Sequence, residues 1–330
     1  MTVNPSSPDH REQRERSALL PSVAAVVVTY ENERDTADCL TSLLASDYPI
    51  GRIFLVDNGS RDGSIDRLRI RFREDPKLEI LCNEENLGYA TAANLGIRRA
   101  MDIASHVLLI NNDAELAAGS LGILVDELSN HPEAGLAVPR IVLSSNPDIV
   151  WRGPSRFSWL RAGAIDPERG RVVGRASQPS RCVELATGCV ILVRRDTFER
   201  VGLFDEGYFL YGEDTDFCLR SREAGICLLY VSQAVARHRV DRTEPTPTSA
   251  FTAFHMARSH VLVIRLHARG IVCGYALAVH WLAHTLVIAL RATFRGHGRH
   301  PVVGWIRGSI EGMRVPIPHP AGRPRDAGTT

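Results

Sequence analysis

The feature that most constrains the fold is the alternation of short apolar runs with longer helical patterns over the first 110 residues of this 330-residue chain. The runs have the length of strands and are apolar on both faces. Such runs, separated by helices, are typical of a parallel sheet covered on both sides. The sequence therefore predicts an α/β fold with a mostly parallel central sheet flanked by helices. The four runs are residues 23–29, 53–57, 78–82 and 106–110.

Helical patterns separate these runs. Asp62 is placed to be the N-cap of one of these helices, and a turn containing glycine opens the next. After about residue 140 the rhythm changes, because Gly, Pro, Arg and two tryptophans (Trp151 and Trp159) become frequent as far as Arg181. The remaining predictions are helices over 62–73, 86–101, 115–129 and 214–224, and strands over 189–193 and 227–231.

The chain divides into three parts by composition. Residues 1–21 are polar and rich in proline and charge, which predicts disorder. Residues 22–269 carry the α/β pattern. The last part, 270–330, contains an apolar helix and a basic tail: 271–290 has no Asp, Glu, Lys or Arg, and seven arginines follow against two acids. A helix of that length and composition suits either contact with a membrane or burial against the rest of the protein.

Overall charge and cysteine usage exclude several classes. The formal net charge is +1, so no global positive field indicates a nucleic-acid partner. Seven cysteines form no C-x-x-C pair, and most lie in apolar runs, where cysteine acts as a small hydrophobic residue. This pattern predicts free thiols in a reducing compartment. The N-terminus lacks the apolar core of a secretory signal, so a cytoplasmic location is expected.

Common nucleotide and hydrolase motifs are absent from the sequence. No G-x-G-x-x-G follows the first strand, and neither G-x-x-x-x-G-K-S/T, G-x-S-x-G nor H-E-x-x-H occurs. A parallel α/β sheet without a glycine-rich phosphate loop needs another way to hold phosphates. A metal ion bound by carboxylates is the usual alternative.

Polar residues follow three of the predicted strands, where ligands of parallel sheets bind. They are Thr29-Tyr30-Glu31, Asp57-Asn58 and Asn111-Asn112-Asp113. Asp113 is the first candidate ligand for a hard divalent cation such as Mg²⁺ or Mn²⁺. Its alternative role is the N-cap of the helix predicted over 115–129.

A second group of acids opens the helix predicted over 214–224. Glu213, Asp214 and Asp216 fall within four residues, directly after a run that contains Tyr211. Favourable interaction with the helix dipole is one explanation. The aromatic residues before them favour a cleft, in which a carboxylate serves as a general base. His238, which follows the strand predicted over 227–231, is either structural or a further ligand.

Together these segments resemble family 2 glycosyltransferases, the inverting enzymes with the GT-A fold, a single Rossmann-like domain followed here by C-terminal helices. The resemblance runs from about Val23 to His267 and includes an aromatic-x-x-x-Arg segment from Phe254 to Arg258. The order of five motifs carries it. These are VVVTYEN, LVDNGSRDGS, NLGYATAANLGI, LLINNDAEL and TGCVILVRRDTFERVGLFDEGYFLYGEDTDFCLRSREAG.

The resemblance implies a role for each matching residue. Asp214 is implied as the catalytic base, Asp113 and His238 as metal ligands, and Glu213 and Tyr211 as acceptor contacts. Asn111 stands where many members have an aspartate, which leaves one carboxylate fewer. The positions implied to bind the nucleotide-sugar donor are Thr29, Tyr30, Glu31, Asp57, Asn58, Asn86, Gly88, Tyr89 and Asn112.

The implied reaction is a single displacement that inverts the anomeric carbon, in the synthesis of cell-wall or surface polysaccharide or glycolipid. Bacterial rhamnosyltransferases are the nearest branch in appearance, although the donor sugar and nucleotide stay open. The arginine-rich region from Trp151 to Arg181 is a place for the acceptor, a glycan or lipid-linked glycan. Arg291, Arg295 and Arg299 beside the apolar stretch suit an anionic inner membrane surface. The alternatives are a sugar-1-phosphate nucleotidyltransferase and a non-catalytic binding subunit.

Overall fold

A computed structural model describes residues 20–174, 178–240, 249–294 and 299–316 of the chain. Most of the segment expected to be disordered, Arg295 and the end of the basic tail lie outside these residues. Two compact units are present. The first comprises residues up to 156, 165–209 and 213–244, and the second comprises 157–164, 210–212 and the chain from 245 onward. The division predicted at residue 270 stays a prediction.

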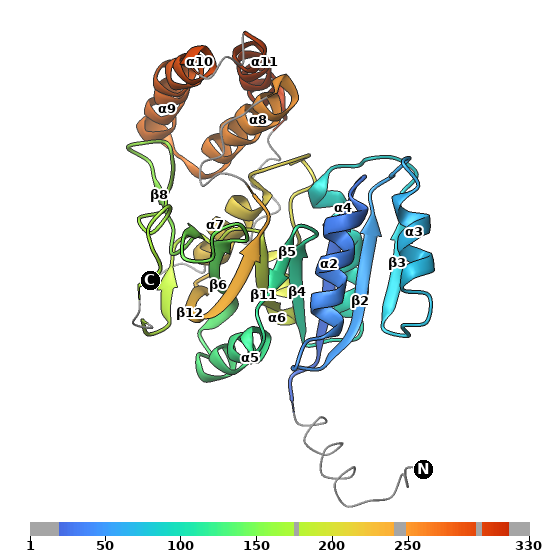
Figure 1. The fold of residues 1–330 in the computed structure, drawn as a ribbon. Helices are drawn as coiled ribbons and strands as arrows, with labels where there is room; N and C mark the ends of the chain where they lie inside the picture. Colours follow the sequence, from blue (N-terminus) through green and yellow to red (C-terminus); the bar gives the residue numbers. More distant parts are fainter. Residues whose placement is uncertain (1–19, 175–177, 241–248, 295–298, 317–330) are drawn as a thin grey trace, which may run out of the picture. The chain divides into compact units, whose positions relative to one another are not determined.

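The first unit is built on a central sheet (Figure 1). The four strands that the sequence predicted within the first 110 residues form a parallel half of this sheet. Strands β1, β2, β3 and β4 pair in parallel in the order β3-β2-β1-β4. Strand β11 then enters antiparallel between β4 and β6, and β12 pairs parallel with β6. The strands are β1 (Val23–Thr29), β2 (Ile50–Asp57), β3 (Leu78–Cys82), β4 (His106–Asn111), β5 (Ala114–Leu116), β6 (Ala134–Leu143), β7 (Val150–Arg152), β10 (Arg181–Val183), β11 (Val190–Arg194) and β12 (Cys227–His238).

Helices cover both faces of this sheet. Alternate residues of β1 explain why: Ala25 and Val27 belong to the core cluster shared with α2 and α5, whereas Val26 faces Gly96 of α4 on the other side. A side chain at Gly96 would overlap Val26, so glycine lets α4 lie close to the sheet. The helices are α2 (Glu33–Leu44), α3 (Ser64–Arg71), α4 (Tyr89–Met101), α5 (Ser120–Asn130), α6 (Arg195–Val201) and α7 (Glu213–Glu223).

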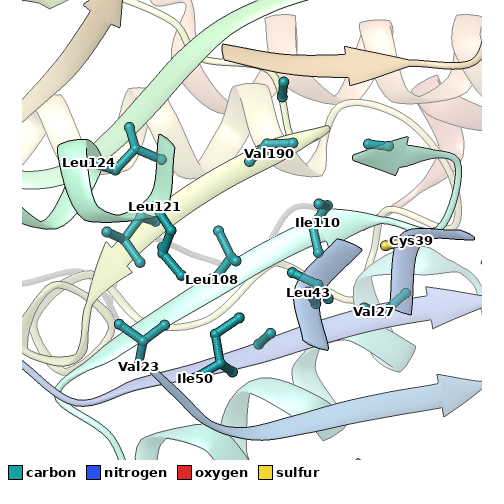
Figure 2. Packing of buried hydrophobic residues seen from close by; sticks show 14 of the residues in the cluster. Val23, Val27, Cys39, Leu43, Ile50, Leu108, Ile110, Leu121, Leu124 and Val190 are labelled. Carbon is teal, nitrogen blue, oxygen red and sulfur yellow. The ribbon is translucent and has the colours of Figure 1, made fainter. Parts of the chain in front are cut away.

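The core of the first unit joins residues from distant parts of the chain. Figure 2 shows Val23 and Val27 of β1, Leu43 of α2 and Leu108 of β4 in one cluster, all at most 2% exposed. Burying each such side chain contributes about 1.5–3 kcal/mol. The continuous apolar strands of the sequence are thus explained by coverage on both faces. The predicted α/β fold with a mostly parallel sheet flanked by helices is confirmed.

Three local predictions are wrong. Asp62 is not the N-cap of α3, because the helix begins at Ser64 after Gly63, and Asp62 accepts a hydrogen bond from the Ser64 amide at 3.0 Å. Residues 115–129 are not one helix, because 114–116 form β5 against β12. The cysteines are not all free: Cys182 of β10 and Cys227 of β12 form a disulfide across adjacent strands.

The second unit is helical, apart from the short strands β8 (Arg156–Ser158) and β9 (Gly163–Ile165) where the chain passes between the units. Its helix over 300–314 lies inside the predicted basic tail and was not expected from the charge pattern. A continuous helix, Gly270–Phe294, is long and apolar enough by composition to cross a membrane, with a mean hydropathy of 1.7 and 17% of its best window buried. The elements are α8 (Ala250–His267), α9 (Gly270–Val279), the π-helical turn η1 (His280–His284), α10 (Thr285–Phe294) and α11 (His300–Arg314).

Helices α8 and α11 pack unusually close, because three glycines line one face of α11. Gly304, Gly308 and Gly312 are four residues apart, and a methyl group on any of them would overlap the backbone of α8 at Ala250, Phe254 or Arg258. The guanidinium of Arg265 on α8 donates to the carbonyl oxygens of Gly312 and Val315 at 2.7 and 2.8 Å, which satisfies the end of α11.

Candidate active site

The polar strand ends meet where the strand order of the first unit reverses. The chain passes outward from β1 through β2 to β3 and then returns to β4 on the other side of β1, which makes the ends of β1 and β4 a topological switch point. Thr29 ends β1, and Asn112 directly follows β4. The Asn112 amide donates to the Thr36 hydroxyl at 3.1 Å and to the Thr29 hydroxyl at 3.4 Å. The structure therefore brings these two predicted residues together.

Asn58 holds the loop that follows β3. Its amide nitrogen donates to the Asn86 side chain at 3.0 Å and to the Gly88 carbonyl at 3.2 Å. Its side-chain oxygen accepts from Asn83 at 3.0 Å and from the Leu87 amide at 3.1 Å. These four bonds use the full capacity of one amide side chain. Asn58 is buried and acts on its surroundings by fixing this loop.

Gly88 stands at a position that only glycine fills without strain. Its φ of +85° lies in the left-handed region, and a Cβ there would overlap the backbone of Phe209. The next amide, that of Tyr89, donates to the Phe209 carbonyl at 2.7 Å. The segment before α7 is thus joined to the start of α4.

The other predicted donor positions lie at the ends of β1 and β2. Thr29 and Asp57 are buried, and Asp57 accepts from the Ser60 amide at 3.1 Å. Tyr30 is 46% exposed. Glu31 is exposed at a φ of +50°, and its amide donates to the Ser60 hydroxyl at 2.9 Å. Buried side chains that fix the backbone, next to exposed polar groups that are free to contact a ligand, suit a binding site at the edge of a sheet.

Asp113 and His238 are in direct contact. The Asp113 Oδ1 and His238 Nε2 atoms are 3.0 Å apart, and β5 pairing with β12 places Ala114 opposite His238. Helix α5 begins only at Ser120, so Asp113 is not its N-cap. The His238 ring lies 4.2 Å from the Trp151 ring, and its Nδ1 is buried without a hydrogen-bond partner among the described residues. An imidazole and a carboxylate this close are able to bind one divalent cation together, so the pair remains a candidate metal site.

Asp214 is held by backbone amides in the first turn of α7. Its Oδ2 accepts from the Gly188 amide at 2.8 Å, and its Oδ1 accepts from the Thr215 amide at 2.6 Å. Gly188 precedes β11, where a side chain would come within 3.2 Å of the Asp214 Cβ. The carboxylate is therefore fixed from two elements distant in sequence.

Glu213, next to it, has a different environment. Burial, together with the charge of Asp214, raises the pKa of Glu213 to about 8, so its carboxyl is neutral at pH 7. Its Oε2 has no hydrogen-bond partner among the described residues. Burial and the charges of Glu213, Asp214 and Asp113 raise the pKa of Tyr89. These acids and the tyrosine hydroxyl therefore share one neighbourhood.

Asp216 has a structural role. It pairs with Arg220 at 2.7 Å, and the same guanidinium donates to the carbonyl oxygens of Val201 and Leu203, both at 2.9 Å. Tyr211 belongs to the second unit, where it is 42% exposed with a φ of +64°.

Three residues of the site have no marked sequence signal. Trp151 packs on His238, and Gly188 orients Asp214. Arg239, which follows His238, forms ion pairs with Asp35, Asp38 and Glu115 at 2.7–2.9 Å, so it ties α2 to β5. The only sequence signals were the position of Arg239 directly after His238 and that of Gly188 within the TGC segment.

Comparison with known proteins supports these observations. The family model described as glycosyl transferase family 2 matches residues 24–202. The chain is 33% identical over 260 residues, 72% of its length and 81% of the relative's, to the N-acetylglucosaminyl-diphospho-decaprenol L-rhamnosyltransferase of Mycobacterium tuberculosis.

Solved structures agree on the fold. The mannosyltransferase PcManGT from Pyrobaculum calidifontis, in complex with GDP-Man and Mn²⁺, aligns with a TM-score of 0.55 at 16% identity over 90% of this chain and 88% of its own. GalNAc-T7 with UDP, GalNAc and Mn²⁺ aligns with a TM-score of 0.61 at 19% identity, over 75% of this chain and 48% of its own. The matched motifs, the fold and the relatives together show that the chain belongs to glycosyltransferase family 2 and is a glycosyltransferase.

Proposed function

We propose that this enzyme transfers a sugar from a nucleotide-diphosphate donor to an acceptor hydroxyl with inversion at the anomeric carbon. The observation that carries the proposal is the pair of adjacent carboxyls in different environments. Asp214 is held by two backbone amides, whereas burial keeps Glu213 neutral at pH 7. Neighbouring acids whose environments set them apart are typical of a base beside a hydrogen-bond donor.

Asp214 is the general base in this proposal. Its carboxylate takes the proton of the acceptor hydroxyl while that oxygen forms a bond to the anomeric carbon. The bond from the anomeric carbon to the diphosphate oxygen breaks on the opposite face, and its electron pair leaves with the nucleoside diphosphate. Neutral Glu213 donates a hydrogen bond to the acceptor, whereas the acceptor contact expected at Tyr211, which belongs to the second unit, stays a prediction.

Asp113 and His238 fit a divalent cation, Mg²⁺ or Mn²⁺. The two ligand atoms are 3.0 Å apart, about the spacing of neighbouring ligands in an octahedron with bonds of about 2.1 Å. When bound, such an ion supplies positive charge for the leaving diphosphate.

The loops at the switch point bind the donor nucleotide. Tyr30, Glu31, Asn86 and Asn112 are the contacts, while buried Thr29, Asp57 and Gly88 shape the edge and Tyr89 closes it. Asn58 is assigned a positioning role, because its four internal hydrogen bonds leave no free donor or acceptor.

The substrate pair we propose is nucleotide-activated rhamnose and a lipid-linked glycan. The support is the mycobacterial relative, whose name specifies L-rhamnosyl transfer to an N-acetylglucosaminyl-diphospho-decaprenol. The alignment covers 72% of this chain and 81% of the relative.

The test is turnover of the full-length enzyme with Mg²⁺ or Mn²⁺, a panel of nucleotide sugars including dTDP-rhamnose, and a lipid-linked N-acetylglucosamine acceptor. Asp214→Asn should lower transfer by about 10²–10⁴-fold and leave donor binding by calorimetry unchanged. Glu223→Gln, an exposed acid on the same helix, is the matched control and should retain activity. Transfer by Asp214→Asn at the rate of the unaltered enzyme would contradict the assignment of the base.

We also propose that the helix Gly270–Phe294 rests on the inner membrane surface and brings the cytoplasmic enzyme to such an acceptor. Ile271, Leu282 and Phe294 are 89%, 75% and 85% exposed, which is a large apolar surface to leave in water. Arg291 lies in its last turn and Arg299 follows it in the sequence, and both charges suit anionic lipid.

Flotation with vesicles containing anionic lipid tests this surface. Replacing Leu282 and Phe294 together by serine should reduce vesicle binding at least tenfold, because each buried side chain contributes about 1.5–3 kcal/mol. The control is Ile70→Ser in the first unit, where Ile70 is also 70% exposed. Equal flotation of the double variant and the unaltered protein would exclude the membrane contact.

A further inference from the structure

Three histidines gather inside the helical unit, separate from the carboxylates of the first unit. His260 lies on α8, and His280 and His284 lie one turn apart in the π-helical turn η1. One ring nitrogen from each lies within 4.8 Å of the others, and His280 is fully buried. A single π-helical turn within an α-helix is rare overall, and the examples that occur are often found at functional sites.

Hydrogen bonds fix the same tautomer on all three rings. The Nε2 atoms of His260 and His284 contact the carbonyl oxygens of Ala162 and Arg161, and a carbonyl oxygen only accepts. The Nε2 of His280 lies 2.8 Å from the Ser309 hydroxyl, whose own proton is donated to the Trp305 carbonyl. Each Nε2 therefore carries the proton, and each neutral ring presents its lone pair at Nδ1.

Two of these lone pairs point at each other. The Nδ1 atoms of His260 and His280 are only 2.8 Å apart. Two acceptors at this distance repel unless a cation lies between them.

We propose that His260, His280 and His284 bind a transition-metal ion through their Nδ1 atoms, with Zn²⁺ the best match. The remaining N–H group of a metal-binding histidine is normally donated to a carbonyl or another acceptor, and all three rings already meet this condition. The ligand set is three imidazoles without a carboxylate, which favours Zn²⁺, Cu²⁺, Ni²⁺ or Co²⁺ over Mg²⁺ and Mn²⁺.

The geometry requires only small movements. With Zn–N bonds of about 2.0 Å, tetrahedral ligand atoms lie about 3.3 Å apart. The Nδ1 atoms of His260 and His280 would separate slightly from 2.8 Å, and His284, at the partly exposed side of the cluster, would rotate inward. The ion would clasp α8 to η1 and leave one coordination position for water.

The experiment measures Zn²⁺ binding to the full chain after chelator treatment, in saturating Mg²⁺ so that the Asp113 site does not compete. We expect one tightly bound Zn²⁺ per chain. His284→Ala should weaken Zn²⁺ binding about 100-fold or more, and Ser309→Ala, which removes the acceptor for His280, about 10–100-fold. His267→Ala on α8 and Asp113→Asn are the matched controls and should bind as the unaltered chain does.

Two further measurements keep the result decisive. Co²⁺ in place of Zn²⁺ should give the intense visible absorption of a four-coordinate ion, and this band should be absent in His284→Ala. Circular dichroism checks that each variant is folded; because His284 is partly exposed, its variant is the one expected to retain the fold. Failure of the unaltered chain to bind Zn²⁺, or equal binding by folded His284→Ala, would overturn the proposal.

Discussion

In the first unit, the Asp214 carboxyl in the first turn of α7 is held by backbone amides; in the second unit, the His260 and His284 imidazoles are held by backbone carbonyl oxygens. Asp214 accepts from Gly188 and Thr215, whereas His260 and His284 donate to Ala162 and Arg161. Amide donors suit negatively charged groups, and carbonyl acceptors suit neutral imidazoles that present a lone pair. The backbone groups around a polar side chain therefore indicate its chemistry: amide donors favour an anionic carboxylate, and carbonyl acceptors favour a neutral imidazole whose free nitrogen is able to bind a cation.

The packing of the units differs in the same way. The first unit buries long aliphatic side chains between a sheet and helices. The second brings α8 and α11 together through glycines, so backbone meets backbone. Substitutions should therefore affect each unit through a different mechanism.

The largest expected effect on stability comes from the Cys182–Cys227 disulfide of the first unit. The disulfide closes a loop of 45 residues, and losing it through Cys182→Ser should reduce the free energy of unfolding by about 4 kcal/mol. Urea unfolding under oxidising conditions measures the difference. Cys82→Ser, at an exposed free cysteine, is the control. An unaltered chain equally stable with and without reductant would contradict the prediction.

Replacing Asp113, the proposed metal ligand, should affect the first unit's site and leave the histidine cluster of the second unit unchanged. Asp113→Ala should lower transfer by about 10²–10³-fold, because charge on the leaving diphosphate loses its compensation. Zn²⁺ binding in the second unit should stay unchanged. Parallel measurement of turnover and Zn²⁺ affinity checks both, and loss of both together would show that the sites are not independent.

Gly308 tests the close approach of α8 and α11. Gly308→Leu would overlap the Phe254 backbone and should reduce the stability of the second unit by about 2–3 kcal/mol. Arg307→Ala, at an exposed neighbour, should change little. Hydrogen exchange resolved by segment distinguishes loss in the second unit from loss in the first, which should keep its protection.

The smallest expected effect is the change in unfolding free energy per pH unit that Glu213 causes. Its folded-state pKa of about 8 lies above its ordinary value of 4.5, so the neutral form stabilises the fold below pH 4.5 and that contribution is lost as pH rises toward 8. Glu213→Gln should remove a slope of up to about 1.4 kcal/mol per pH unit in this range. Unfolding free energies from pH 5 to 8 measure it. An unchanged slope in the variant, with Glu223→Gln as the control, would be evidence against a neutral Glu213.

The sequence predicted the first unit far better than the second. Strands over 23–29 and 78–82 match β1 and β3, because continuous apolar runs have one stable environment in a covered sheet. Asp113, His238 and Asp214 were singled out as acids or ligands beside strands and helix starts. Gly188 and Trp151 were not, because their roles depend on contacts between residues distant in sequence.

The close helix packing and the histidine cluster of the second unit were not predicted, because their sequence signals are weak. The glycines of α11 reduce helix propensity, and their purpose is visible only against α8. In the sequence, His280 and His284 only lower the apolar character of a helix. Their partner His260 lies twenty residues before His280, so no local pattern links the three. The disulfide was missed because Cys182 and Cys227 lie in strands whose pairing no local pattern specifies.

The most direct test of the account is the anomeric configuration of the product, determined by NMR on sugar transferred by the full-length enzyme from a donor of known configuration. Attack by an acceptor oxygen activated by Asp214, on the face opposite the diphosphate, predicts a product of inverted configuration and none from Asp214→Asn at comparable rate. A product with the donor's own configuration would contradict the single displacement and the role assigned to Asp214.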